Sequence, residues 1–327
     1  MSQVVIQNRV VVLGAAGFIG YHIADSLSKL TSQKMLIVDN FVRGVRDKEF
    51  LRLIASPNIE FIERDLSLEV SYHGLFEGDD IVINCAAMNG TKNFYLNSTG
   101  VVRHSAISSI LAAEYAASAK VSKYIYFGTP ESYAGAINLG IAKIPTSEAV
   151  PLIIDDPLNL RWSYAASKTI GEIATIANHF QFGLNAIIFR IHNIYGPRMG
   201  KDHVVPDLVT KFLSGSFEVY GVNESRTFMY IDDLVNILKK FISNNFNDRA
   251  LIYNVGSSKE IQIKSLAELI LKQMNLEKDI IPLPSLKGSV LRRVPDVTLL
   301  RSIIEFEETD LSIGISKYIE WYLKANK

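Results

Sequence analysis

The stretch GAAGFIG, residues 14–20, lies between an apolar run and a segment whose apolar residues recur at helical spacing. The run before it, Val10 to Leu13, has the length and β-branched content of a buried strand, and Phe18 to Leu30 is the predicted helix. Three glycines in this setting permit a tight turn, a close approach of the backbone to a pyrophosphate, and close packing of helix on strand. The helix N-terminus offers free N–H groups to a phosphate. The stretch therefore predicts a dinucleotide-binding turn with contacts from Gly14, Gly17, Phe18, Ile19 and Gly20.

The next apolar run indicates which dinucleotide is bound. Met35 to Val38 is a second predicted strand, and Asp39 follows it about 20 residues after the last glycine. A carboxylate at this place holds a ribose 2′-hydroxyl and repels a 2′-phosphate, so we expect NAD rather than NADP. Arg43 and Arg46 lie just beyond, and their charges would soften that preference. The alternative is a structural turn with a solvated aspartate.

Composition describes a globular chain without a charge bias. The 327 residues are 48% hydrophobic and 21% charged, and 34 Lys and Arg balance 34 Asp and Glu. We therefore expect no nucleic-acid or membrane partner. The single cysteine, Cys85, excludes an internal disulfide and a multi-cysteine metal site, and no metal is expected. No signal pattern and no run of about 18 apolar residues is present, so a cytoplasmic location is expected.

Strand-like apolar runs alternate with helical segments over the first half of the chain. The runs are residues 59–62, 81–85, 123–127 and 185–190. This alternation predicts an α/β fold with a Rossmann-type doubly wound parallel sheet. Beyond it, short elements punctuated by Gly and Pro predict a smaller, mixed α/β C-terminal portion. We expect an NAD-binding domain over 1–190, with sheet elements also from about 231–256, and a mainly substrate-binding portion over 191–327.

Residues that follow the predicted strands complete the expected cofactor contacts. A pair after the third strand commonly lies beside the adenine in dinucleotide-binding folds, although a simple loop is an equal alternative. A pair of small residues after the fourth strand leaves room for the cofactor. These further contacts are Asn40, Asp65, Leu66, Ala86 and Ala87.

A tyrosine and a lysine on one predicted helix, residues 162–182, form a candidate catalytic pair. Tyr164 and Lys168 are four positions apart, so their side chains leave the same face of the helix. A lysine ammonium near a phenol stabilises the phenolate and lowers its pKa. Such a tyrosine can take a hydroxyl proton while a hydride leaves the same carbon for a nicotinamide. A YxxxK pattern alone is common. Here it indicates a catalytic pair because it follows the glycine turn and the Asp39 strand in the chain.

The motifs in this order resemble those of the extended short-chain dehydrogenase/reductase family, specifically its nucleotide-sugar epimerase/dehydratase branch. The resemblance runs from about Arg9 to about Ser302. It is carried by GAAGFIG at 14–20, VDNFVRG at 38–44, NCAA at 84–87, FGTPESYAG at 127–135, YAASK at 164–168, FRIHNIYGPRMG at 189–200, SRTFMYIDD at 225–233 and RRVPD at 292–296. Together these motifs are specific for the family and much less specific for the reaction.

The resemblance implies roles for residues of the catalytic site. Tyr164 is then the catalytic base and acid, Lys168 holds the nicotinamide ribose, and the Thr129 hydroxyl hydrogen-bonds the sugar 4-oxygen. Glu131 falls where 4,6-dehydratases and UDP-glucuronate decarboxylases of the family carry a glutamate that acts near C5. Pro130 replaces the aspartate with which those dehydratases protonate the departing 6-hydroxyl, so an ordinary 4,6-dehydratase is disfavoured. A chemical and a structural role for Glu131 both remain open.

The resemblance also implies contacts to the substrate. Guanidinium groups suit phosphate oxygens, and Arg226 with Arg292 or Arg293 falls where the family binds the pyrophosphate of a nucleotide sugar. Asn193 corresponds to a position near the substrate phosphates, and the segment 89–95 would cover the sugar with Lys92 and Tyr95. A solvated surface charge is the alternative for any single arginine. His192 and His203 lack partners at metal-ligand spacing.

These inferences favour an NAD-dependent nucleotide-diphosphate-sugar epimerase that acts through a transient 4-keto sugar. The alternatives are a dehydratase or decarboxylase that uses Glu131 at C5, a non-catalytic NAD-binding regulator or scaffold, and a reductase that releases its cofactor each turnover. The apolar helices predicted at 105–119 and 162–182 resemble the pair that forms the dimer interface in this family, and a homodimer is expected.

Overall fold

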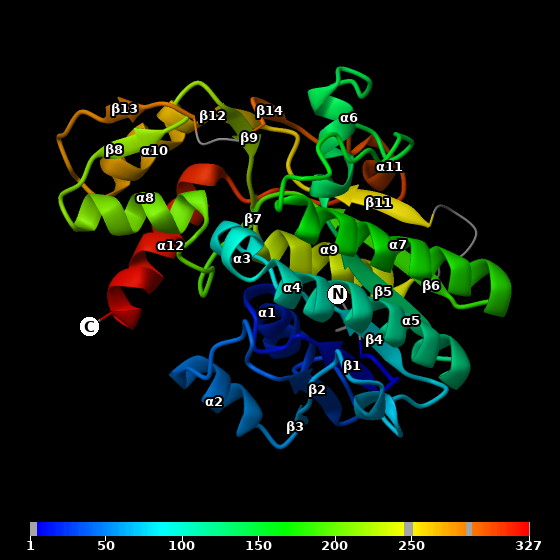
Figure 1. The fold of residues 1–327 in the computed structure, drawn as a ribbon. Coiled ribbons are helices and arrows are strands. Elements are labelled where there is room, and N and C mark those ends of the chain that lie inside the picture. Colours follow the sequence, from blue (N-terminus) through cyan, green and yellow to red (C-terminus); the bar gives the residue numbers. More distant parts are fainter. Residues whose placement is uncertain (1–4, 245–250, 286–289, 327) are drawn as a thin grey trace.

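A seven-stranded parallel sheet forms the centre of the computed structural model, which describes residues 5–244, 251–285 and 290–326 (Figure 1). Its strands are β1 Val10–Leu13, β2 Met35–Asp39, β3 Ile59–Glu63, β4 Ile81–Asn84, β5 Lys123–Gly128, β6 Ala186–Ile191 and β11 Ile252–Val255. Their spatial order is β11-β6-β5-β4-β1-β2-β3. The chain winds one way from β1 to β3 and the other way from β4 to β11, which confirms the predicted doubly wound sheet. A crevice opens at the carboxyl ends where the winding reverses, between β1 and β4.

Helices cover both faces of the sheet because its strands are apolar on both sides. Val10 and Val12 of β1 pack with one set of helices, and Val11 and Leu13 pack with the other. The first set is α1 Phe18–Leu27, α2 Lys48–Ile54 and α9 Ile231–Ser243. The second set contains α4 Ser98–Val102, α5 Ser108–Ala119 and α7 Trp162–Phe182. A π-helical turn, Arg103–Ile107, joins α4 to α5, so this helical stretch begins seven residues earlier than the predicted start at Ser105.

The second half of the chain adds a smaller mixed portion, seen at the upper left of Figure 1. It contains a three-stranded sheet in the order β12-β9-β14 and the pairs β13-β8 and β10-β7. Its elements are β7 Ile194–Tyr195, α8 Val204–Leu213, β8 Glu218–Tyr220, β9 Ser225–Thr227, β10 Met229–Tyr230, β12 Glu260–Gln262, α10 Ile263–Gln273, β13 Ile281–Leu283, β14 Arg292–Arg293, α11 Thr298–Arg301 and α12 Leu311–Ala325. The short connecting helices elsewhere are Glu69–Tyr72, α3 Thr91–Leu96, Pro130–Tyr133 and α6 Ala134–Asn138.

Gly171 lets α7 lie close against the sheet and α5. A Cβ built on Gly171 would lie 2.2 Å from the hydroxyl of Tyr126 and 2.6 Å from the Cβ of Ser109. Tyr126 is fully buried and donates its hydroxyl hydrogen to the carbonyl of Lys168 at 3.1 Å. The close packing therefore fixes the part of α7 that carries the candidate catalytic lysine.

We expect Gly171→Ala to lower the free energy of unfolding by about 1–3 kcal/mol, because overpacking outweighs the helix propensity that alanine brings. Urea unfolding followed by circular dichroism measures the change. Gly78→Ala is the control, since its Cβ would meet only the Ala119 carbonyl at an ordinary 3.5 Å, and it should change stability by under about 0.5 kcal/mol. Equal stability of wild type and Gly171→Ala would contradict the packing argument.

Candidate active site

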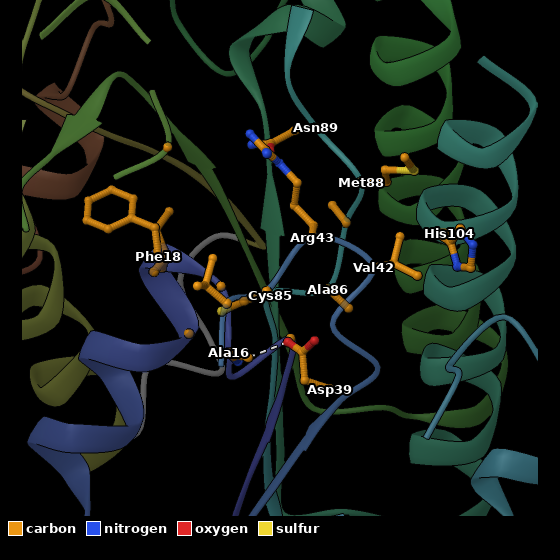
Figure 2. Close-up of a pocket in the computed structure, with 18 of the residues that line it drawn as sticks. Ala16, Phe18, Asp39, Val42, Arg43, Cys85, Ala86, Met88, Asn89 and His104 are labelled. Carbon is orange, nitrogen blue, oxygen red and sulfur yellow. Dashed lines mark hydrogen bonds between the residues drawn. The ribbon is translucent and has the colours of Figure 1, made fainter. Parts of the chain in front are cut away.

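One cavity of about 570 Å³ occupies the crevice at the carboxyl ends of the strands (Figure 2). Every residue predicted to contact the cofactor lines it. They are Gly14, Gly17, Phe18, Ile19, Gly20, Asp39, Asn40, Asp65, Leu66, Ala86, Ala87, Tyr164 and Lys168. Asn89, His104 and Trp321 also line it, and the sequence motifs did not assign them to the cofactor site. Arg43 lines it too, and the sequence predicted for it only an influence on the choice between NAD and NADP. The topology thus gathers residues from positions 14 to 168 at one place.

The glycine turn has no space for side chains. Gly14 has a φ of +78°, and a Cβ there would lie 2.8 Å from the backbone of Ala86. A Cβ on Gly20 would lie 2.2 Å from the Gly14 carbonyl oxygen. These contacts leave a cradle in which backbone N–H groups at the start of α1 face the cavity. The turn therefore fits a dinucleotide pyrophosphate.

Asp39 is fixed at the end of β2 by backbone donors. Its Oδ2 accepts a hydrogen bond from Ala16 N at 2.9 Å, and its Oδ1 accepts one from Phe41 N at 2.7 Å. Burial raises the pKa of this carboxyl, and the two backbone N–H groups oppose the rise. The carboxylate lies beside the glycine turn in Figure 2, at the place where it can accept from a ribose hydroxyl.

Tyr164 and Lys168 both line the cavity, but burial acts on them in opposite directions. The lysine side chain is buried, with Nζ 4.2 Å from the centre of the Tyr126 ring. Burial lowers the pKa of Lys168 to about 7. Burial also raises the pKa of Tyr164, the Glu131 charge raises it further, and the Thr129 hydroxyl lowers it. The expected lowering of the Tyr164 pKa by Lys168 is not found, since burial disfavours the charged forms of both residues.

An unpredicted aromatic ring covers Tyr164, the candidate catalytic tyrosine. Phe94 of α3 stacks on Tyr164 with ring centroids 5.2 Å apart and planes 16° apart, and it is buried with Met88 and Val101. Lys92 and Tyr95, the residues of this segment expected to bind substrate, are exposed and do not line the cavity. The segment therefore turns an apolar face toward the site and its predicted polar contacts toward solvent. The sequence signal for this buried ring was one large apolar residue, Phe94, among neighbours that are more exposed in a short helix.

Two arginines hold Glu131. Arg161 donates to both carboxylate oxygens at 2.9 to 3.1 Å, and Arg293 Nη1 donates to Oε1 at 2.6 Å. Burial alone would raise the pKa of Glu131, but the charges of Arg293 and Arg161 lower it to about 2. Thr129 lies two residues earlier, and its hydroxyl accepts from the Glu131 backbone N–H at 3.3 Å. Sequence analysis missed Arg161, although its position three residues before Tyr164 places it on the same helical face.

The structure separates the two arginines of β14. Arg292 is exposed and pairs with Glu260 at 2.8 Å, whereas Arg293 is 6% exposed and faces Glu131. Successive strand residues point to opposite faces, so only one of the pair can enter the site. Arg226 lies opposite Arg293 in the neighbouring strand, and burial together with the Arg293 charge lowers its pKa to about 10. Two guanidinium groups, that of Arg293 buried and that of Arg226 partly buried, therefore lie on adjacent strands of the mixed portion.

Two further polar residues after β6 have distinct environments. Asn193 has a φ of +35°, and its buried Nδ2 has no hydrogen-bond partner in the described part of the chain. His192 Nε2 lies 2.5 Å from the hydroxyl of Tyr133, and burial lowers its pKa to about 3, so the imidazole is neutral. Within the described residues no group of His, Cys, Asp and Glu could hold a metal ion. Nor do the described helices include one long and apolar enough to cross a membrane.

The glycine turn, the fixed carboxylate of Asp39 and the Tyr164 and Lys168 pair define a dinucleotide-binding enzyme that transfers a hydride and a proton. The chain belongs to the NAD dependent epimerase/dehydratase family, whose model matches residues 10–256. It is therefore an NAD-dependent enzyme, as the sequence motifs predicted. When bound, NAD supplies the hydride acceptor and donor of the reaction.

Individual relatives cover nearly the whole chain. A UDP-N-acetyl-alpha-D-glucosaminuronate decarboxylase from Bacillus cytotoxicus is 29% identical over 331 residues, which cover 97% of this chain and 98% of the relative. A UDP-N-acetylglucosamine 4-epimerase structure from Methanobrevibacter ruminantium is 22% identical, with a TM-score of 0.85 over 97% of this chain and 99% of that one. A UDP-glucuronic acid 4-epimerase from Bacillus cereus in complex with NAD is 21% identical, with a TM-score of 0.84 over 98% and 100%. The two structures share the fold with this chain.

We expect Glu131→Gln to change the pH dependence of stability. The pKa of Glu131 falls from 4.5 in the unfolded chain to about 2 in the fold, so its ionised form contributes stability above pH 4.5, and that contribution is lost as the pH falls toward 2. The contribution is on the order of 3 kcal/mol. Urea unfolding at several pH values between 2 and 6 should show a shallower acid loss in Glu131→Gln than in wild type.

A control separates this carboxylate from acid denaturation in general. Glu268→Gln removes an exposed carboxylate that lies 3.8 Å from Lys264 on α10, and it should leave the wild-type slope unchanged. An identical slope in Glu131→Gln and wild type would contradict the arginine clamp.

Proposed function

We propose that this protein is a nucleotide-diphosphate-sugar 4-epimerase that acts through a transient 4-keto sugar. The observation that carries the proposal is the double ion pair of Glu131. A carboxylate held by Arg161 and Arg293, with a pKa of about 2, is a poor base for removing the C5 proton. Pro130 in addition offers no proton to a departing 6-hydroxyl. Chemistry confined to C4 is then the reaction that the remaining residues support.

Three side chains carry that chemistry. Tyr164 takes the proton of the sugar 4-hydroxyl as the C4–H bond breaks, and returns it when the ketone is reduced on its other face. Thr129 hydrogen-bonds the same oxygen and holds it against the tyrosine. Lys168 binds the nicotinamide ribose. Because its pKa is about 7, it can gain or lose a proton next to the phenol near neutral pH. Phe94 and the buried walls exclude water, so the ketone stays bound between the two half-reactions.

A nucleotide-sugar decarboxylase is the second candidate. It is favoured by the 29% identical decarboxylase and by the two arginines that pair with Glu131, two residues after Thr129. A ketone at C4 makes a C5 carboxylate a β-keto acid, which loses carbon dioxide without a base at C5. The clamped Glu131 is therefore no obstacle to this reaction, and Arg161 or Arg293 would bind the sugar carboxylate.

The mixed portion would bind the diphosphate of the substrate. We assign this role to Arg226 and Asn193, with Arg293 directed instead toward the sugar through its contact with Glu131. Residues 1–190, with the sheet elements from about 231–256, would then hold the cofactor and 191–327 mainly the nucleotide sugar. Lys92 and Tyr95 lie on the exposed face of α3 and would reach the substrate only if α3 moved.

The protein would act as a homodimer in the cytoplasm. Helices α5 and α7 pack on each other. Ile107 in the turn before α5, and Ile170 and Ile173 of α7, are 36 to 57% exposed. Val102 of α4 adds to the same apolar set at 43% exposure. A four-helix contact between two copies would bury these side chains.

Proton NMR of the purified protein with NAD and UDP-, dTDP-, GDP- and CDP-sugars in D₂O tests the proposed reaction. A 4-epimerase should give a C4 epimer without solvent deuterium, because hydride returns to the carbon it left. Tyr164→Phe should lower the rate by about 10²- to 10⁴-fold, whereas the exposed Tyr95→Phe should not. Loss of a carbon with deuterium at C5 would identify the decarboxylase. Deuterium at C5 without carbon loss would show C5 chemistry and contradict both candidates.

We expect Ile173→Asp to convert the dimer into a monomer, since a charge would be buried in an apolar contact. Light scattering during size-exclusion chromatography measures the mass. Leu213→Asp on α8 is the control, because this residue is 45% exposed in the mixed portion and should leave a dimer. A wild-type mass of one chain would contradict the proposed assembly.

A further inference from the structure

Arg43 places a cation in the wall of the cofactor cavity, between three segments that are distant in sequence. Its backbone follows Asp39, and its side chain reaches Asn89 in the segment after β4, as Figure 2 shows. Nε donates to Asn89 Oδ1 at 3.2 Å, and Nη2 lies 3.8 Å from a carboxylate oxygen of Asp202. Arg43, Asn89 and Asp202 all line the cavity.

The guanidinium lies in a slot made by two glycines. A Cβ built on Gly90 or on Gly200 would in each case lie 3.1 Å from Arg43 Nη2. Gly90 has a φ of +107°, a conformation that other residues rarely adopt. Both segments therefore approach the guanidinium with bare backbone. Such a slot fixes the direction of a long side chain that would otherwise be mobile in solvent.

Most donors of this guanidinium are unused. Among the described residues, Nε–H makes its one hydrogen bond, while an arginine has five N–H groups. The Asp202 oxygen at 3.8 Å is too distant for a hydrogen bond, and the Arg43 side chain is 31% exposed. A positioned cation with free donors on a cavity wall is suited to an anionic ligand.

The same segment passes directly over the glycine turn. Val45 N donates to the Ala16 carbonyl at 3.1 Å, and a Cβ on Gly44 would lie 2.5 Å from the Cβ of Ala16. The N-terminus of α1, with Gly17 and Phe18, therefore lines the same cavity as Arg43. In Figure 2 the Arg43 side chain lies apart from Phe18, beside Asn89. An anion bound at the helix N-terminus would share this cavity with the Arg43 guanidinium.

We propose that Arg43 binds the pyrophosphate of the dinucleotide, together with the N-terminus of α1, and so retains the cofactor between turnovers. This role rests on NAD binding and not on which sugar reaction follows. An enzyme that must return the hydride it removed needs to retain its cofactor, because loss of the reduced cofactor would leave the keto sugar without a hydride donor. Arg43 is thus a retention residue, and it takes no part in the proton transfer.

Arg46 provides a matched control within the same segment. Its guanidinium pairs with Glu63 at 2.5 Å and lies 4.4 Å from the centre of the Phe41 ring, and it does not line the cavity. The two arginines carry the same charge three positions apart, but they face different surroundings. An effect of net charge alone would be the same for both substitutions.

The test is the dissociation rate of NADH from the full-length protein, followed by the loss of NADH fluorescence after mixing with excess NAD. Arg43→Gln should accelerate dissociation by about 10- to 100-fold, since a charge-assisted hydrogen bond to the bound cofactor is lost. Arg43→Lys keeps the charge without the fork and should give a smaller acceleration. Arg46→Gln should stay within about twofold of wild type. Thermal unfolding without cofactor checks that all variants fold.

Two outcomes would overturn the proposal. Dissociation of NADH from Arg43→Gln at the wild-type rate would show that the guanidinium does not touch the pyrophosphate. Weaker binding of NADPH by Arg43→Gln, with NADH binding unchanged, would instead assign Arg43 to a 2′-phosphate. Neither outcome depends on the sugar substrate, so neither one tests the proposed 4-epimerase reaction.

Discussion

The bare backbone of Gly14 is the contact on which the cofactor crevice depends. Its missing side chain lets the end of β1 touch the backbone of Ala86 after β4, which brings the two innermost strands of the doubly wound sheet together at their carboxyl ends. Strand β2 pairs with β1 so that Val38 lies opposite Leu13. The next residue, Asp39, therefore lies within hydrogen-bond distance of the turn. Larger residues at Gly14 would push the strands apart and open the crevice, whatever the rest of the site contained.

Glu131 joins the two halves of the molecule at the reacting end of the site. It follows β5 of the sheet, yet it is held by Arg161 from α7 and by Arg293 from β14 of the mixed portion. Loss of the carboxylate would leave two guanidinium groups near each other without their shared counter-charge, so the mixed portion is tied to the sheet through one carboxylate. Under the proposed function, the two ion pairs that hold Glu131 would also make it a poor base at C5.

The fold and the residues that line the cofactor cavity could be predicted from the sequence because both depend on local patterns. The spacing from Gly14 to Asp39 and the helix 162–182 depend on period and chain order, and α7 has those bounds. The substrate side was less predictable because it depends on which way side chains turn after distant segments meet. Neither the choice between Arg292 and Arg293 nor the stacking of Phe94 on Tyr164 follows from spacing along the chain. The position of Arg161, three residues before Tyr164, would have predicted its place on the same side of the helix.

Burial of Tyr164 and Lys168, the proposed catalytic pair, disfavours the charged form of each. Water exclusion raises the pKa of Tyr164 and lowers that of Lys168, so each residue alone favours its neutral form. If Tyr164 and Lys168 hold the nicotinamide end of NAD as proposed, the positive charge of that ring would favour the phenolate of Tyr164 over its neutral form. Tyr164 would then be a stronger base with the cofactor bound than without it.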